Sequence, residues 1–287
     1  MSTNLFESIQ KQLLEITNKK FSLKYIKENI CPIFEFINDS NNNKFLIAGS
    51  QGIGKSTLSN ILEKNYKIFY KKKVLSLSLD NYYLTKKERI NISKTIHPLL
   101  FTRGVPGTHD IQKLLRDIKD FDKSKFPIYT PIFNKLTDDR TKKIKKVTSD
   151  VDILILEGWC CGCPPLSSKY LYTNINTLEK EKDINKIWRN YFNKQLKEKY
   201  STLFGLFDKL IYLKPPSFSF IINWRLKQEI MMANKKNKKM MNKKEIIEFV
   251  THYEKITKWM MKILPFHSDL CIDINKNQKI IKLKYKL

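Results

Sequence analysis

Residues 44–57 constrain the fold of this chain more than any other segment, and their sequence is KFLIAGSQGIGKST. A short apolar run precedes a glycine-rich turn that ends in Gly54, Lys55 and Ser56, and apolar residues at helical spacing follow from Leu58. Glycine lets the backbone curl so that successive N–H groups face one point, where the next helix adds partial positive charge. A glycine-rich turn without a ligand is the alternative, but the flanking strand and helix favour a phosphate-binding P-loop.

The residue types in this loop predict its chemistry. Lys55 is expected to reach the β- and γ-phosphates of a nucleotide, and the hydroxyl of Ser56 is expected to ligate Mg²⁺. The predicted nucleotide-binding residues are Gly49, Ser50, Gln51, Gly52, Ile53, Gly54, Lys55, Ser56 and Thr57.

The rest of the chain alternates strand patterns with helical patterns. Strands are predicted at 44–49, 73–79, 151–157, 208–214 and 269–274. Most of them are nearly continuous apolar runs, as expected for strands that are buried on both faces. Helical spacing lies between them, at 55–70, 110–121, 178–199, 217–233 and 243–263. This alternation predicts an α/β fold, in which a parallel sheet carries helices on both faces.

The N-terminal 43 residues stand apart from this alternation. Residues 4–17 and 22–38 show helical spacing that is interrupted near Pro32. We therefore expect a helical extension over 1–43 and a single α/β domain over 44–287. A chain of 287 residues with 41% hydrophobic content is long enough to bury one such core.

The composition argues against a membrane protein, a disulfide-rich protein and a zinc-binding protein. No stretch approaches the ~18 apolar residues of a membrane span, and the first ten residues lack an apolar run. The five cysteines are an odd number, and the cluster at 160–163 lacks a second ligand pair at zinc-like spacing. A soluble cytoplasmic protein without membrane partners is therefore expected.

The net charge of +26 raises the possibility of a nucleic-acid partner. The excess is lysine spread along the whole chain, together with Asn, Ile, Phe and Tyr, all residues of A/T-rich codons. Basic and aromatic residues are not interleaved as in single-strand binding platforms. We therefore expect no specific nucleic-acid partner.

Two acids end predicted strands, where ligands collect in parallel sheets. Glu157 and Gly158 follow the third strand, so the carboxylate could hold Mg²⁺ beside Ser56, or it could cap a neighbouring helix. Asp80 follows the second strand and could accept a proton from an attacking hydroxyl. An Asx turn is the structural alternative for Asp80.

Cationic residues lie between the second and third strands. Arg103 and His109 belong to a loop shaped by two glycines and a proline, and the arginine fork suits a planar carboxylate. Lys135 and Arg140 are weaker candidates of the same kind. All four could instead stabilise loops by bonding backbone carbonyls.

A further cation precedes a lysine-rich segment. Arg225 belongs to the segment 223–229, whose helical pattern runs into residues 234–244, and these are expected to form a solvated loop. Arg225 could pair with Glu229 on one helix face, or it could neutralise a transferring phosphoryl group from a mobile lid around 225–245.

Several motifs together resemble the D-glycerate 3-kinase group of the phosphoribulokinase and uridine kinase superfamily. They lie at 49–57, 79–85, 103–110, 157–159, 224–229 and 249–254. The resemblance covers about residues 44–275, and it is most specific at the 103–110 loop and the Glu-Gly-Trp of 157–159. Where the group has a second acid after Asp80, this chain has Asn81.

The resemblance implies a P-loop NTPase three-layer sandwich, with a five-stranded parallel sheet of order 2-3-1-4-5 and a helical lid. It implies ATP and Mg²⁺ as cosubstrates and D-glycerate as the acceptor, phosphorylated to 3-phosphoglycerate. The implied catalytic residues are Asp80, Lys55 and Arg225. The implied metal ligands are Ser56, Glu157 and Asp80, and the implied substrate ligands are Tyr83, Arg103, His109, Lys135 and Arg140.

Other functions stay open at this point. The acceptor could be a nucleoside, a sugar phosphate or a pantothenate-like alcohol. The chain could also be a P-loop NTPase linked to nucleic acid, although it lacks the Asn-Lys-x-Asp motif of GTPases. We expect a monomer or a homodimer.

Overall fold

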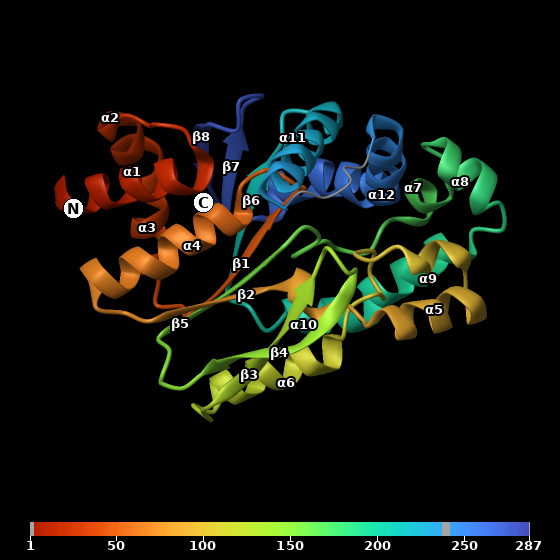
Figure 1. Cartoon of the computed structure of the whole chain (residues 1–287), viewed down its shortest axis with the longest axis horizontal. Coiled ribbons are helices and arrows are strands. Elements are labelled where there is room, and N and C mark those ends of the chain that lie inside the picture. Colours follow the sequence, from red (N-terminus) through yellow and green to blue (C-terminus); the bar gives the residue numbers. More distant parts are fainter. Residues whose placement is uncertain (1–2, 237–241, 287) are drawn as a thin grey trace.

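The computed structural model describes residues 3–236 and 242–286. A six-stranded sheet runs through the centre, with helices on both sides (Figure 1). Its strands are, in spatial order, β2 (Val74–Ser78), β5 (Ile153–Gly158), β1 (Lys44–Gly49), β6 (Lys209–Lys214), β7 (Leu270–Ile274) and β8 (Ile280–Tyr285).

The strand that carries the P-loop lies inside this sheet. β1 pairs in parallel with β5 on one side and with β6 on the other. The register puts Ile47 opposite Glu157 and Gly49 opposite Leu213. The polar residues at the carboxyl ends of β1 and β5 are therefore neighbours, as expected for a parallel sheet.

The predicted α/β fold with a mostly parallel sheet is confirmed, but the predicted five-stranded, wholly parallel sheet needs correction. The five predicted strands are β1, β2, β5, β6 and β7, and they keep the predicted relative order 2-3-1-4-5 within a larger sheet. The sheet has six strands in the order β2-β5-β1-β6-β7-β8. The added strand, β8, pairs antiparallel to β7 at the sheet edge. Its sequence, IIKLKY, alternates apolar and lysine residues, as edge strands exposed to solvent often do.

A separate hairpin was also not predicted. β3 (Ile128–Asn134) and β4 (Asp139–Val147) pair antiparallel with a register shift between Pro131 and Phe133. β4 has the sequence DRTKKIKKV and is largely exposed, so its lysines conceal the strand pattern. Such a strand forms because its partner strand supplies the backbone hydrogen bonds.

The helices fill both sides of the sheet. They are α1 (Thr3–Thr17), α2 (Leu23–Tyr25), α3 (Cys31–Asn38), α4 (Lys55–Asn65), α5 (Lys86–Thr95), α6 (Ile111–Asp122), α7 (Ser168–Tyr172), α8 (Thr177–Lys182), α9 (Ile187–Gln195), α10 (Ser201–Phe204), α11 (Phe218–Lys236) and α12 (Lys243–His267). π-helical turns are η1 (Ile26–Ile30), η2 (Tyr66–Tyr70) and η5 (Leu196–Tyr200), and 3₁₀ turns are η3 (Leu79–Tyr82) and η4 (Pro98–Phe101). The expected interruption near Pro32 is a change from π-helix to α-helix at Cys31, without a break.

Alternate residues of the strands enter two cores. Phe45 and Ile47 of β1 join the core beneath α1, α3 and α4. Leu46 and Ala48 join the other core, beneath α6 and α9. Successive side chains of a strand point to opposite faces, so one apolar strand supplies both cores.

The N-terminal helices dock on α4 and the C-terminal strand. Figure 1 places α1 to α3 beside α4 and β8, far from α8 and α9. Ser8 Oγ donates to Asn65 Oδ1 at 2.8 Å, and Asn65 Nδ2 donates to Gln12 Oε1 at 3.0 Å. Tyr66 Oη donates to the Phe34 carbonyl at 2.7 Å. Buried polar contacts of this kind fix the extension in one orientation.

Part of the expected lid around 225–245 lies outside the described residues, at 237–241. On one side α11 ends at Lys236, and on the other α12 begins after the cap residue Asn242. Within the described ranges, no helix combines the length and apolar character needed to cross a membrane.

Candidate active site

A cavity of about 860 Å³ lies at the carboxyl ends of the central strands. The P-loop lines it, together with Asp80 of η3, Glu157 of β5 and Trp159, which directly follows β5. Basic side chains that line the same cavity are Lys19, Lys55, Arg103, Lys135, Arg225 and Lys227. A polar cavity rich in cations at this sheet edge suits a small polyanion.

The P-loop backbone has the conformation that its glycines predict. Gly52 has φ +76° and Gly54 has φ +111°, in the left-handed region that favours glycine. A Cβ on Gly52 would also lie 2.9 Å from the Cβ of Trp224. Gln278 Nε2 donates to the Gly52 carbonyl at 2.6 Å, so the loop is held from the C-terminal hairpin as well.

The Lys55 ammonium and the Ser56 hydroxyl of the loop both have hydrogen-bond partners in the protein. Lys55 Nζ donates to the Ser50 carbonyl at 3.0 Å, which folds the side chain back over the loop. Ser56 Oγ donates to Glu157 Oε1 at 3.0 Å across the sheet edge. A hydroxyl and a carboxylate at this distance are two hard oxygen donors, the kind that Mg²⁺ prefers.

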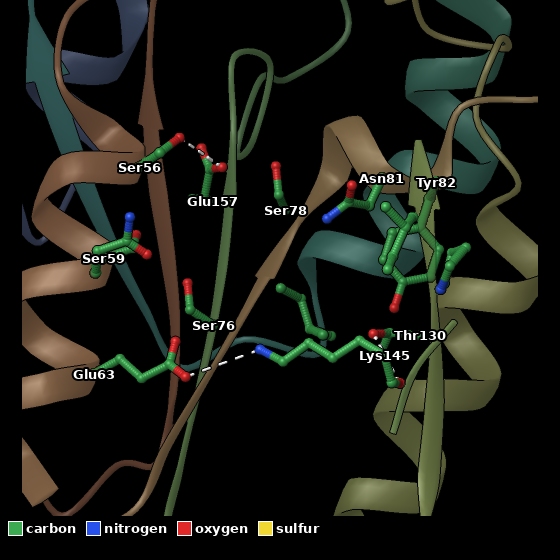
Figure 2. Close-up of a pocket in the computed structure, with 14 residues that line it drawn as sticks. Ser56, Ser59, Glu63, Ser76, Ser78, Asn81, Tyr82, Thr130, Lys145 and Glu157 are labelled. Atoms are coloured by element: carbon green, nitrogen blue, oxygen red, sulfur yellow. Dashed lines mark hydrogen bonds and ion pairs between the residues drawn. The ribbon is translucent and has the colours of Figure 1, made fainter. Parts of the chain in front are cut away.

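A second cavity, of about 400 Å³, meets the first at Ser56 and Glu157. Figure 2 shows it between α4, β2 and the β3–β4 hairpin, with Ser76 and Ser78 pointing into it. The Ser59 hydroxyl, on a residue only 1% exposed, has no protein partner. This polar lining can bind the water that accompanies a hydrated cation, so the Ser56–Glu157 pair fits Mg²⁺.

No three His, Cys, Asp or Glu side chains gather into a metal-binding group in the described part of the chain. Mg²⁺ beside a nucleotide needs only one or two protein oxygens, because phosphates and water supply the others. The clustered cysteines Cys160, Cys161 and Cys163 are buried and free.

Asp80 lies among hydrogen-bond donors at the start of η3. Lys135 Nζ donates to Oδ2 at 2.5 Å, and Tyr83 Oη donates to Oδ1 at 2.6 Å. Burial would raise the pKa of Asp80, but the charge and hydrogen bond of Lys135, the Tyr83 hydroxyl and the charge of Lys55 outweigh it. The pKa of Asp80 is therefore held well below its usual range, and the group is an ionised carboxylate.

Arg103 faces the same cavity from the loop before α6. Its guanidinium forms an ion pair with Asp138 and lies 5.7 Å from the centre of the Phe133 ring. Tyr253 Oη donates to the backbone carbonyl of Arg103 at 2.6 Å. One guanidinium nitrogen contacts Asp138, and the remaining N–H donors of the fork can bind a further carboxylate.

Two predicted substrate ligands do not line either cavity within the described residues: His109 and Arg140. Arg140 donates to the Tyr83 carbonyl at 2.9 Å and pairs with Asp110. The His109 ring lies 4.8 Å from the Tyr83 ring. Both residues therefore support the position of Tyr83 and, through it, that of Asp80.

His109 is buried in its neutral form. Gly107 N–H donates to the Tyr200 hydroxyl, and the same hydroxyl forms a hydrogen bond of 2.6 Å with Nδ1 of His109. Nε2 has no partner in the protein. Burial lowers the pKa of His109 to about 3, although the charge of Asp80 acts in the opposite direction.

Arg225 lies on α11 and is largely buried. It pairs with Glu229 at 2.8 Å, and its guanidinium lies 5.5 Å from the centre of the Phe249 ring. Arg225 therefore pairs with Glu229 on one helix face, as one of the two alternatives predicted, and it also lines the cavity.

Sequence reasoning missed the residues that hold the site together. Arg89 is fully buried and bonds Asp138, the partner of Arg103, as well as the Phe101 carbonyl. Gln278 supports the P-loop from a segment 226 residues away. In the sequence, a buried arginine inside a helical pattern cannot be distinguished from an exposed one. The contact of Gln278 joins segments that are far apart in the sequence, so no local pattern indicated it either.

Sequence comparison finds relatives among kinases, although no family model matches the chain. The uncharacterized kinase mug58 of Schizosaccharomyces pombe is 31% identical over 228 residues, which cover 72% of this chain and 76% of that protein. The chloroplastic D-glycerate 3-kinase of Arabidopsis thaliana is 27% identical over 250 residues, or 80% of this chain and 52% of the plant protein. The chain belongs to the P-loop kinase family of D-glycerate 3-kinase.

A solved structure has the same fold. D-glycerate 3-kinase from Cryptococcus neoformans superposes with a TM-score of 0.69 over 100% of both chains, at 22% identity. The family resemblance seen in the sequence motifs is thus confirmed, and this chain is a member of an ATP-dependent kinase family.

We expect the stability of this family member to depend on His109 in mild acid. Its folded pKa lies below the ordinary value of 6.5, so below that pH the unfolded chain binds a proton that the folded chain does not. Stability therefore falls as pH drops, by about 1.4 kcal/mol per pH unit for a fully excluded proton. His109→Gln should lose on the order of 1–2 kcal/mol less than the wild type between pH 7 and pH 5.

Urea unfolding of both proteins at pH 7 and pH 5 measures this difference. His97 and His252 also have lowered pKa values, because of burial, so part of the pH dependence should persist in the variant. An equal loss in the two proteins would contradict the burial of a neutral His109.

Proposed function

We propose that this kinase transfers the γ-phosphoryl group of ATP to the C3 hydroxyl of D-glycerate, giving ADP and 3-phosphoglycerate. The observation that carries the proposal is the position of Asp80, which accepts a hydrogen bond from Lys135 and shares one cavity with the P-loop and Arg103. An acceptor that has both a hydroxyl and a carboxylate matches a proton acceptor flanked by cations.

The P-loop supports the nucleotide part of this proposal. Its backbone amides and Lys55 would hold the triphosphate, and Ser56 and Glu157 would hold Mg²⁺, with Asp80 as a further carboxylate on that side. When bound, Mg²⁺ neutralises the charge on the phosphate oxygens. The protein groups keep the γ-phosphoryl group in place for the acceptor.

Asp80 would orient the acceptor hydroxyl and receive its proton. The bond from the C3 oxygen to the γ-phosphorus forms, the bond from that phosphorus to the β–γ bridging oxygen breaks, and ADP leaves. A carboxylate with so low a pKa is a weak base, which suits a loose transition state in which the proton moves late. If Lys135 turns to the glycerate carboxylate, the pKa of Asp80 rises as substrate binds.

The other predicted site residues would bind the substrate or hold Asp80 in position. Arg103 would bind the substrate carboxylate, Tyr83 would fix the Asp80 oxygens, and His109 and Arg140 would hold Tyr83. Arg225 would stabilise the transferring phosphoryl group from the predicted lid around 225–245. In this proposal residues 44–287 form the kinase domain.

An acceptor panel tests the function. ADP release from ATP and Mg²⁺ should be measured with D-glycerate, glycerol, a nucleoside, a sugar phosphate and pantothenate, with Lys55→Ala as the inactive reference. D-glycerate should be preferred by at least about tenfold in kcat/KM, since a matched carboxylate contact is worth over a kcal/mol. Preference for another acceptor would refute D-glycerate as the substrate but would still support a kinase activity. ATP hydrolysis that RNA stimulates without any acceptor would favour a nucleic-acid-linked NTPase.

Asp80→Asn should lower kcat by about 10²–10⁴ with little change in KM for ATP, because the amide keeps the size and shape of the carboxylate but cannot take a proton.

Lys135→Met should move the acidic limb of the pH profile of kcat/KM to higher pH. Removing the ammonium leaves burial to raise the pKa of Asp80, so the carboxylate protonates in mild acid. A pH–rate profile that is identical in Lys135→Met and wild type would contradict the pairing.

Arg103→Lys keeps the charge but loses the planar fork. KM for D-glycerate should rise about tenfold while KM for ATP stays within twofold, because only the carboxylate contact is weakened. Glycerol, which lacks that carboxylate, should not suffer from the change. The matched control is Arg116→Lys, an exposed arginine of α6. An equal loss for both acceptors would place Arg103 at the phosphates.

A further inference from the structure

The cavity that contains the P-loop has a second end, away from Asp80. Apolar residues of the N-terminal helices line it together with α4 and the C-terminal hairpin: Leu13, Ile16, Phe21, Tyr25, Ile30, Leu58, Ile61, Ile274 and Ile280. We name these residues the N-terminal chamber. Sheet order separates the two ends, because Asp80 follows β2 on one side of β1 and the chamber borders β7 and β8 on the other.

Specific contacts hold the aromatic side chains of the chamber in place. The rings of Phe21 and Tyr25 stack with centres 5.2 Å apart and planes 30° apart. The Ile280 N–H donates to the Tyr25 hydroxyl at 2.7 Å, which ties the N-terminal segment to β8. Gln10 Nε2 donates to the Phe21 carbonyl at 2.6 Å. These contacts hold an aromatic surface at a fixed place beside the P-loop.

Polar groups connect the chamber to the loop. Gln278, which borders the chamber, donates to the Gly52 carbonyl. Lys279 Nζ lies 5.9 Å from the centre of the Phe21 ring, so a cation accompanies the aromatic surface. An apolar pocket with a few polar groups at its edge is the usual form of a site for a flat, partly polar ring.

The direction of a bound nucleotide follows from the two ends of the cavity. On the proposed function, the γ-phosphate points toward Asp80, and the triphosphate follows Lys55, Ser56 and Thr57 along the start of α4. The base must then lie beyond Thr57, and the next cavity-lining residue of α4 is Leu58, a wall of the chamber.

We propose that the N-terminal extension completes the nucleotide site, with the purine ring of ATP bound in the N-terminal chamber against Phe21. This inference rests on the proposed use of ATP at the P-loop. It gives residues 13–30 a role in binding the base, and it makes the extension part of the nucleotide site.

Calorimetric binding of ATP and of inorganic tripolyphosphate, each with Mg²⁺, tests the inference without turnover. Tripolyphosphate has the phosphates but no base, so wild type should bind ATP at least about tenfold more tightly. Phe21→Ala should weaken ATP binding about tenfold or more and leave tripolyphosphate within twofold. Phe21→Leu keeps apolar volume and should give a smaller loss of the same kind, which protects the test against misfolding of the alanine variant.

Phe266→Ala is the matched control, since Phe266 at the end of α12 is 80% exposed and does not line the cavity. It should leave both affinities unchanged. Unchanged ATP affinity in Phe21→Ala, or an equal loss for ATP and tripolyphosphate, would overturn the inference while the P-loop function stands. Failure of the wild type to bind either ligand would overturn both.

Discussion

The backbone conformation of the P-loop is the constraint on which the rest of the structure depends. A loop that turns its N–H groups toward phosphate cannot satisfy them internally, so its shape has to be held from outside. Three distant segments do this: Leu213 of β6 meets Gly49, Trp224 of α11 meets Gly52, and Gln278 bonds the Gly52 carbonyl. β6, α11 and the turn between β7 and β8 therefore hold the loop from outside.

Charge balance around the loop is the second organising feature. Asp80 and Glu157 lie in a cavity with several cations, and each acid has a partner of its own: Lys135 for Asp80 and Ser56 for Glu157. Arg103 similarly forms an ion pair with Asp138, and Asp138 also accepts a hydrogen bond from the buried Arg89. Paired groups of this kind are preorganised, so binding of a polyanion replaces existing contacts instead of ordering free side chains.

Sequence patterns predicted the elements that obey simple periodicity. The buried strands were visible because strands covered on both faces must be apolar throughout. The β3–β4 hairpin and β8 were not predicted, because exposed or edge strands contain lysines that resemble a loop. The corrected strand count of the sheet, six instead of five, comes from this difference.

The sequence by itself determined the P-loop, the α/β alternation and the family, because glycines, strand-end acids and apolar runs act within a few residues of each other. Only the tertiary structure decided which candidates share a cavity. Lys135 turned out to contact Asp80 directly, whereas His109 and Arg140 support Tyr83 from outside the cavity. The position of the N-terminal helices was likewise hidden, since it depends on contacts with α4 and β8 that no local pattern encodes.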